Sequence, residues 1–282
     1  MKRKPFGATG LELPVIGQGT WNLPESGARL KEAQRAIRRG IELGMTHIDT
    51  AEMYGAGRVE ERLGETIRGV PRERLFITTK VLPSNATYRR TLRAAEQSLG
   101  RLGLEYVDLF LLHWPGSHPL EATMRAFDEL VKTGKTRFVG VSNFEAPEML
   151  EAASYLKGAR LACNQVLYHL CERGVEHEVL PEAHRHGIAV VGYTPFGRGA
   201  YLRGARRREV LERIAQKHRA TVPQVALAFL TRDPALFAIP KAARVEHVEE
   251  NAGAGELELD NQDVAEIDAA FPRGARGPLA TL

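Results

Sequence analysis

The sequence has no long apolar run, and this absence excludes a class of protein. Of its 282 residues, 43% are hydrophobic and 26% are charged. The longest apolar stretches, such as Val107–Leu112, contain a charge and are far shorter than the roughly 20 residues that cross a bilayer. The basic segment Met1–Pro5 is followed by no apolar stretch of the kind that a secretory signal has. We therefore expect no membrane partner.

Cysteine is also scarce. Only Cys163 and Cys171 are present, which is typical of a reduced, cytoplasmic protein, although the two lie close enough in sequence for a disulfide. Together with His169 and His177 they resemble a metal-ligand set. Their spacing lacks the paired Cys-x2–4-Cys of structural zinc sites, so we expect no metal.

Linkers and low-complexity segments are missing as well. Length alone allows two domains, but a single α/β barrel has the same length, and we expect one domain over residues 1–282. The net charge of +4 is mild, and we expect a monomer. One basic cluster is interpreted as a solvated helix start and not as a nucleic-acid platform, because no aromatic residues interleave with it: Arg203, Arg206, Arg207 and Arg208.

Apolar runs of the kind found in strands are present throughout the chain. A hairpin is predicted first, with strands near Pro5–Gly7 and Leu11–Val15. Eight strand-like runs follow it: Ile16–Thr20, Met45–Asp49, Leu75–Lys80, Tyr106–His113, Phe138–Asn143, Leu161–Gln165, Ile188–Tyr193 and Leu236–Lys241.

Amphipathic helical patterns separate these runs. Examples are Leu30–Leu43, Thr87–Leu102 and Leu120–Thr133, and the glycines after them are typical of helix C-termini: Gly44, Gly103 and Gly134. Extra helices are predicted between the seventh and eighth strands, at Pro223–Leu230, and near the C-terminus, at Asp263–Ala270.

Strands that alternate with helices pair in parallel, either in an open doubly wound sheet or in a closed (β/α)8 barrel. An open sheet that binds a dinucleotide would carry Gly-x-Gly-x-x-Gly after its first strand. Asn22 stands where the third glycine should follow Gly17 and Gly19, and the second candidate, at 55–60, ends in glutamate. Eight repeats without this fingerprint favour a TIM barrel with an N-terminal hairpin and the two extra helices.

Polar residues stand at the ends of most predicted strands. They are Asp49, Lys80, His113, Ser142 with Asn143, Gln165, Tyr193 and Lys241. In a parallel barrel these ends converge on one face, which carries the active site. Taken singly each has an ordinary explanation, since Asp49 could cap a helix and His113 could lie in the core. Their joint arrangement favours a functional site.

The residue types suggest a proton donor. A free tyrosine has a pKa of about 10 and is a reluctant acid at neutral pH. If Tyr54 meets Lys80, the ammonium favours the phenolate and lowers that pKa, and Asp49 keeps the lysine charged. Tyr54 then becomes a general acid toward a carbonyl oxygen, which His113 can orient. Reduction also requires a hydride cofactor, because none of these residues supplies two electrons.

These motifs resemble the aldo-keto reductase superfamily over essentially the whole chain. The match runs through Ile48-Asp49-Thr50-Ala51-Glu52-Met53-Tyr54-Gly55, Thr78-Thr79-Lys80, Leu111-Leu112-His113-Trp114-Pro115, Gly140-Val141-Ser142-Asn143-Phe144, Asn164-Gln165, Tyr193-Thr194-Pro195-Phe196-Gly197 and Ile239-Pro240-Lys241. The resemblance implies a (β/α)8 barrel that reduces carbonyl groups with NADPH.

The resemblance also implies residue roles. It makes Asp49, Tyr54, Lys80 and His113 the catalytic tetrad. It implies that Ser142, Asn143 and Gln165 bind the nicotinamide carboxamide and that Tyr193 stacks on the ring. The other implied cofactor contacts are Gly19, Thr20, Trp21, Thr194, Pro195, Phe196, Lys241 at the 2′-phosphate, Arg244, His247, Glu250 and Asn251.

Two positions depart from the usual pattern of this superfamily. Ala242 stands where many relatives carry a hydroxyl residue, and His247 stands where they often carry an arginine. We expect Arg244 to compensate as a fork-shaped donor to the phosphate, so that NADPH remains the preferred cofactor.

Several segments are most similar to bacterial members of the methylglyoxal reductase kind, among them Asn164–Leu170. The expected substrate is thus a small carbonyl compound, a 2-oxoaldehyde such as methylglyoxal, in a pocket lined by Trp21 and Trp114. Both tryptophans could equally be core residues. The short tail after Phe271 argues against a lid over a bulky substrate. Two other hypotheses are a non-catalytic barrel that binds nucleotide and a Schiff-base aldolase with Lys80 as nucleophile.

Overall fold

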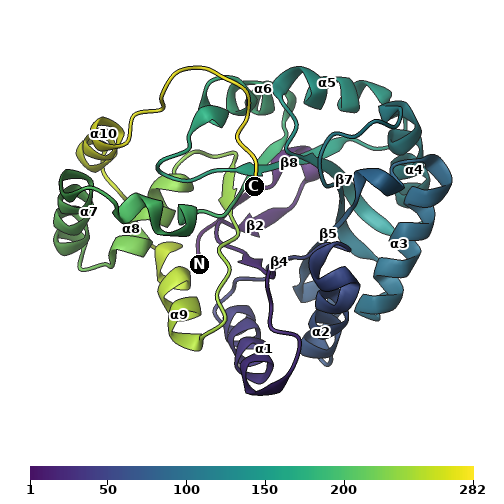
Figure 1. The fold of residues 1–282 in the computed structure, drawn as a ribbon, viewed down its shortest axis with the longest axis horizontal. Coiled ribbons are helices and arrows are strands. Elements are labelled where there is room, and N and C mark those ends of the chain that lie inside the picture. The colour runs from purple at the N-terminus through teal and green to yellow at the C-terminus, as the bar shows by residue number, and fades with distance from the viewer.

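The computed structural model describes all residues, 1–282, and its centre is a closed barrel of eight parallel strands (Figure 1). The strands are β3 Gln18–Gly19, β4 His47–Asp49, β5 Phe76–Val81, β6 Val107–Leu112, β7 Thr136–Ser142, β8 Leu161–Leu167, β9 Ala189–Tyr193 and β10 Leu236–Ala238. They pair in chain order, and a parallel bridge between Ile16 and Ala238 joins the first to the last. The predicted TIM barrel is confirmed.

Helices follow the strands and surround the barrel (Figure 1). They are α1 Gly27–Glu42, α2 Arg58–Ile67, α3 Tyr88–Leu102, α4 Leu120–Lys132, α5 Ala146–Tyr155, α6 Val179–His186, α7 Ala205–His218, α8 Val222–Leu230, α9 Val245–Ala254 and α10 Asn261–Ala270. The three predicted terminal glycines all have positive φ, and φ is 66° at Gly103, which ends α3. No helix is long and apolar enough to span a membrane.

The extra helix predicted before the last strand is confirmed. Two helices lie between β9 and β10, and the predicted segment is α8, which packs against β10. The additional helix is α7, which lies farther from the barrel beside α10 (Figure 1). The segment 223–230 is almost wholly apolar and buried, whereas α7 is rich in arginine. The apolar composition of α8 therefore identifies it as the helix that packs against the barrel.

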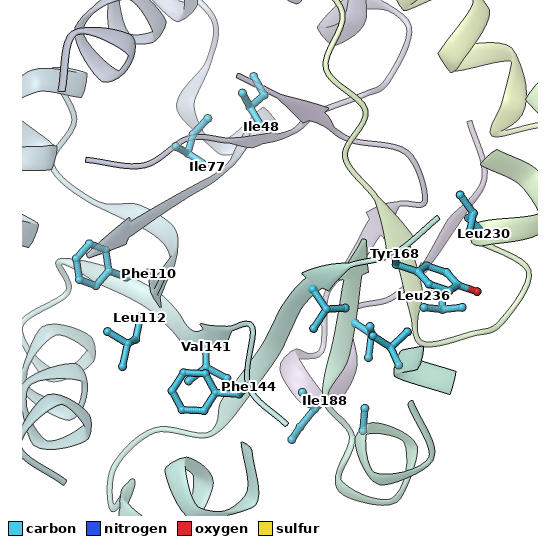
Figure 2. Packing of buried hydrophobic residues seen from close by; sticks show 14 of the residues in the cluster. Ile48, Ile77, Phe110, Leu112, Val141, Phe144, Tyr168, Ile188, Leu230 and Leu236 are labelled. Carbon is cyan, nitrogen blue, oxygen red and sulfur yellow. The ribbon is translucent and has the colours of Figure 1, made fainter. Parts of the chain in front are cut away.

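Most strand residues are buried, because one face of each strand points into the barrel and the other packs against the helices. This explains why the strands lie in largely apolar stretches of the sequence. On β6, Leu109 and Leu111 point into the barrel, whereas Phe110 and Leu112 pack against the surrounding helices. Figure 2 shows Phe110, Leu112 and Val141 in this outer layer.

A hairpin of β1 Arg3–Pro5 and β2 Glu12–Pro14 closes the amino end of the barrel. Its Phe6 is fully buried, with its ring centroid 5.3 Å from that of Phe76 and 5.1 Å from that of Phe237. The first strand begins and ends two residues earlier than predicted. Gly7 turns the chain at φ 54° into a short 3-10 helix, where a Cβ would lie 2.5 Å from the Gly187 carbonyl.

A buried ionic cluster ties α10 and the following tail to the barrel. The Glu176 carboxylate accepts hydrogen bonds from Arg173 at 2.7 and 2.8 Å and from the Tyr168 hydroxyl at 2.6 Å. Arg173 also donates to the Phe271 carbonyl at 2.6 Å, at the end of α10. Burial raises the pKa of Glu176, but its hydrogen bonds and the charge of Arg232 lower it to about 2 overall.

Glu176→Gln should destabilise the protein in a pH-dependent way. Because the folded-state pKa lies below the ordinary 4.5, the stabilisation is complete above 4.5 and is lost as pH falls toward 2. This shift corresponds to about 3 kcal/mol. Urea unfolding of both proteins should show a large difference in free energy of unfolding at pH 7 and a smaller one at pH 3. Glu212→Gln, in an exposed pair with Arg208, is the control and should resemble wild type. A difference that does not change with pH would contradict the assignment.

Candidate active site

The predicted strand-end residues meet at a cavity of about 330 Å³ at the carboxyl end of the barrel. Lys80 is fully buried beside it and is not in its lining. Fifteen predicted residues line the cavity: Gly19, Thr20, Trp21, Asp49, Tyr54, His113, Trp114, Ser142, Asn143, Gln165, Tyr193, Thr194, Pro195, Phe196 and Lys241.

A second cavity of about 440 Å³ adjoins the first and shares Phe196 and Lys241 with it. The remaining four predicted residues line this cavity: Arg244, His247, Glu250 and Asn251. Every predicted site residue except Lys80 therefore lines one of two adjoining cavities.

The sequence did not identify some of the lining residues. Met53 and Arg198 line the first cavity; Met53 lies within a recognised motif, where it was given no role, and Arg198 follows another directly. Leu282 lines it too, and the sequence, which argued only against a lid over a bulky substrate, did not indicate that the tail after Phe271 reaches the cavity. The tail runs back from α10 across the barrel to its centre (Figure 1). No local pattern in the sequence indicates this path.

Strained backbone gathers at the first cavity. Six non-glycine residues have positive φ, and four of them line it: Asn22, Asn143, Thr194 and Arg198. A fifth, Ala56, lies in the turn after Tyr54. Such conformations are costly for residues with a Cβ and concentrate at functional sites.

Lys80 has a complete set of acceptors. Its ammonium donates to Asp49 Oδ1 at 2.6 Å, to the Thr50 carbonyl at 2.8 Å and to Tyr54 Oη at 3.3 Å. An ammonium has three N–H donors, so all three are used. Because Tyr54 Oη accepts from Lys80, its own proton is free to point elsewhere, and Tyr54 lines the cavity.

The protonation states of Lys80 and Tyr54 agree only in part with the prediction from the sequence. Burial lowers the pKa of Lys80, but the Asp49 carboxylate and the Tyr54 oxygen outweigh burial and raise it overall, so the lysine stays protonated. Burial raises the pKa of Tyr54 above its ordinary 10, and the expected lowering by Lys80 is too small to reverse this. The prediction of a net lowered tyrosine pKa is wrong for this state. Tyr54 thus retains its proton at neutral pH.

His113 follows β6 and is neutral. Burial, together with the charge of Lys80, lowers its pKa to about 3. Its ring centroid lies 5.9 Å from that of Tyr54, and its buried Nδ1 has no hydrogen-bond partner. Because a buried N–H without an acceptor is rarer than an unused acceptor, we expect the proton on Nε2. This tautomer has an N–H donor for an oxygen placed beside Tyr54.

The amide side chains are linked to the same network. Gln165 donates to Asp49 Oδ2 at 2.8 Å. Asn143 accepts from the Tyr193 hydroxyl at 2.9 Å and donates to the His113 carbonyl at 3.2 Å. These contacts fix the amides, and both side chains also line the cavity.

Lys241 lies between the two cavities without a carboxylate partner. Although its side chain reaches solvent, partial desolvation lowers its pKa, and no acidic group offsets this shift. In the second cavity the Arg244 guanidinium contacts the His247 ring, whose Nδ1 lies 3.7 Å from Glu250. Two cations thus face this cavity, which suits an anionic group.

The cysteines are free thiols, with Cys163 buried and Cys171 exposed. The structure contains no group of three or more His, Cys, Asp or Glu side chains that could hold a metal ion.

Comparison with known proteins agrees with this geometry. The model of the Aldo/keto reductase family matches residues 15–271. The chain belongs to the aldo/keto reductase family. This membership confirms the predicted oxidoreductase class and the resemblance noted from the motifs.

Three relatives of this aldo/keto reductase are informative. It is 41% identical over 274 residues to methylglyoxal reductase YeaE of Escherichia coli, with 96% of each chain covered. It is 38% identical to glyoxal reductase of Bacillus subtilis over 95% of its length and 93% of the relative. A crystal structure of an aldo/keto reductase from Klebsiella pneumoniae with NADP and acetate matches all of both chains, with a TM-score of 0.93 and 38% identity.

Proposed function

We propose that this protein reduces small 2-oxoaldehydes such as methylglyoxal with NADPH, with Tyr54 as the proton donor. The observation that carries the proposal is the set of hydrogen bonds from Lys80, which leaves the Tyr54 proton free at a cavity that His113 also lines. The expected cofactor, NADPH, is confirmed for the family by the NADP in the Klebsiella structure, which this fold matches over its full length.

The residues present fit this cofactor. Ser142, Asn143 and Gln165 offer hydroxyl and amide groups that pair with a carboxamide, and Tyr193 offers an aromatic face beside them. Lys241 and Arg244 supply cations for a phosphate at the second cavity. Bound NADPH supplies the hydride.

The protein's own groups then handle the proton. Tyr54 Oη donates its proton to the carbonyl oxygen as negative charge develops there. His113, held neutral, donates a hydrogen bond to the same oxygen and orients it. The Lys80 ammonium stabilises the tyrosinate that remains, and Asp49 holds the ammonium in place. The product is an alcohol.

The shape of the cavity favours a small substrate. Trp21, Met53 and Trp114 are among the few large apolar side chains with exposed surface, and all three line it. They form an apolar wall on a cavity that would also hold the nicotinamide, and the remaining space suits a compact carbonyl compound. The names of the E. coli and B. subtilis relatives point to the same class of substrate.

NADPH oxidation followed with methylglyoxal and with an aromatic aldehyde tests the proposal. We expect turnover with both and a higher kcat/KM for methylglyoxal. Failure to oxidise NADPH with either, while NADPH still quenches protein fluorescence, would favour a non-catalytic nucleotide-binding barrel. A Schiff-base role for Lys80 is disfavoured because its amine is fully buried and paired with Asp49. Borohydride trapping should give no adduct.

Lys241→Ala should change the cofactor preference. The ammonium suits the 2′-phosphate that only NADPH carries, so we expect KM for NADPH to rise by at least tenfold and KM for NADH to change little. Steady-state kinetics with each cofactor measures this. Lys157→Ala, which removes an exposed lysine on the loop between α5 and β8, is the control. Equal increases for the two cofactors would mean that the phosphate is held elsewhere.

A further inference from the structure

The turn that carries Tyr54 has an unusual backbone. Gly55, Ala56 and Gly57 are three consecutive left-handed residues, with φ of 56°, 54° and 91°. For a residue with a Cβ this conformation costs about 1–2 kcal/mol, and it persists only where the surroundings determine it. Other contacts must therefore hold this turn in place.

One carboxylate holds the chain before the turn. Glu52 Oε1 accepts hydrogen bonds from the Leu82 amide at 2.6 Å and from Asn85 Nδ2 at 3.0 Å. The Glu52 amide itself donates to the Lys80 carbonyl at 3.2 Å. The chain two residues before Tyr54 is thereby tied to the end of β5.

A second carboxylate holds the chain after the turn. Glu60, in the first turn of α2, is fully buried, and its Oε1 accepts from Thr79 Oγ1 at 2.6 Å. Its Oε2 accepts from Arg101 Nε at 2.7 Å. Arg101 comes from α3 and also packs against Gly57, where a Cβ would lie 2.7 Å from its Cδ and Nε. Arg101 therefore supports both Glu60 and the last residue of the turn.

We propose that Glu52 and Glu60 are positioning residues that hold the Tyr54 hydroxyl beside the Lys80 ammonium. Glu60 binds Thr79, directly before Lys80, and Glu52 binds Leu82, two residues after it. The Tyr54 turn is thus fixed on both sides to the segment that contains its charge partner. Neither carboxylate lines the cavity, so both act through geometry. This inference rests on the proposed function, because it concerns the proton donor of that reaction.

The 3.3 Å contact between Lys80 Nζ and Tyr54 Oη leaves little tolerance for movement. It is already near the limit of a hydrogen bond. A displacement of the hydroxyl by about 1 Å would break it, and misplacement of that size can cost about 100-fold in rate. Loss of either carboxylate should therefore affect the chemical step more than cofactor binding.

Variants of Glu60 separate positioning from folding. In Glu60→Ala we expect kcat to fall at least tenfold, while the NADPH dissociation constant, measured by fluorescence quenching, stays within twofold. Hydrogen–deuterium exchange of residues 51–57 should become faster. Glu60→Gln should recover most of kcat, because a carboxamide can accept from Arg101 and the Thr79 hydroxyl can accept as well as donate. Glu52→Ala should resemble Glu60→Ala.

Asp108 provides a matched control. It is fully buried and accepts from Arg72 at 2.6 Å and from Arg137 at 2.9 Å, but it lies at the amino end of β6, away from the cavity. Asp108→Ala should lose comparable thermal stability, with kcat within threefold of wild type and unchanged exchange at 51–57.

Two results would overturn the inference: an unchanged kcat in Glu60→Ala, or an equal loss of kcat in Asp108→Ala. If Glu60→Ala does not fold, Thr79→Val removes the same hydrogen bond with little change of shape and should give the same exchange result. The exchange measurement needs no substrate. If the wild type reduces no carbonyl compound, the proposed function fails, and the exchange at 51–57 still tests the two carboxylates.

Discussion

Tyr54→Phe should lower the turnover of methylglyoxal by roughly 10²- to 10⁴-fold, the range that a general acid contributes. Phenylalanine keeps the ring and its packing beside His113 but removes the only proton donor that Lys80 can support. The fluorescence quench by NADPH should be unchanged, because the hydroxyl makes no contact that the cofactor-binding residues need. Steady-state rates and a quenching titration on the same preparation measure both quantities.

Tyr155→Phe is the matched control for this experiment. Tyr155 lies on α5, and its hydroxyl donates to Glu151 at 3.1 Å on the surface, so its loss should leave turnover at the wild-type value. Turnover by Tyr54→Phe within tenfold of wild type would reject Tyr54 as the proton donor. It would direct attention to His113, the other neutral donor at the cavity.

Lys80→Met should damage both stability and turnover. Removing one partner of a buried ion pair leaves the other charge uncompensated, which typically costs 3–5 kcal/mol. Asp49 would be left in that state, with only the hydrogen bond from Gln165. Without the ammonium nothing offsets the burial that raises the pKa of Tyr54, so turnover should fall at least 100-fold. Urea unfolding and steady-state kinetics measure the two effects.

The double variant Lys80→Met/Asp49→Asn separates these effects. Removing both charges should restore most of the free energy of unfolding, since no unpaired charge remains. Turnover should remain low, because the tyrosinate still lacks a cation. Recovery of turnover in the double variant would mean that Lys80 serves the fold alone.

The sequence predicted the barrel because its signals are local and repeated. Most strands lie in short apolar runs, and polar residues such as Asp49, Lys80 and His113 stand at or beside the strand ends. Parallel pairing brings those strand ends together on one face of the barrel. The order of polar residues along the sequence was therefore enough to predict the candidate active site. The cofactor residues were predictable only through resemblance, because Ser142 and Gln165 have no distinctive spacing of their own.

Other features depend on contacts between distant segments. The raised pKa of Tyr54 results from burial that no spacing reveals. Leu282 reaches the cavity because Arg173 holds the Phe271 carbonyl and the Leu279 amide lies 3.3 Å from Glu145. The early end of the first hairpin strand depends on the carbonyl of Gly187 beside Gly7. Each of these features depends on contacts between residues from different parts of the chain, which a local sequence pattern does not reveal.

The hairpin that closes the amino end of the barrel has a practical consequence for inhibition. Phe6 fills that end and apolar side chains fill the barrel interior, so under the proposed function the carbonyl compound and the coenzyme would both enter from the carboxyl end. An aromatic compound that packs on Trp21 and Trp114, which both line the first cavity, would obstruct this entrance. Such a blocker would need no resemblance to either reactant, but it would occupy the same cavity as the carbonyl compound, so raising the carbonyl concentration should relieve it.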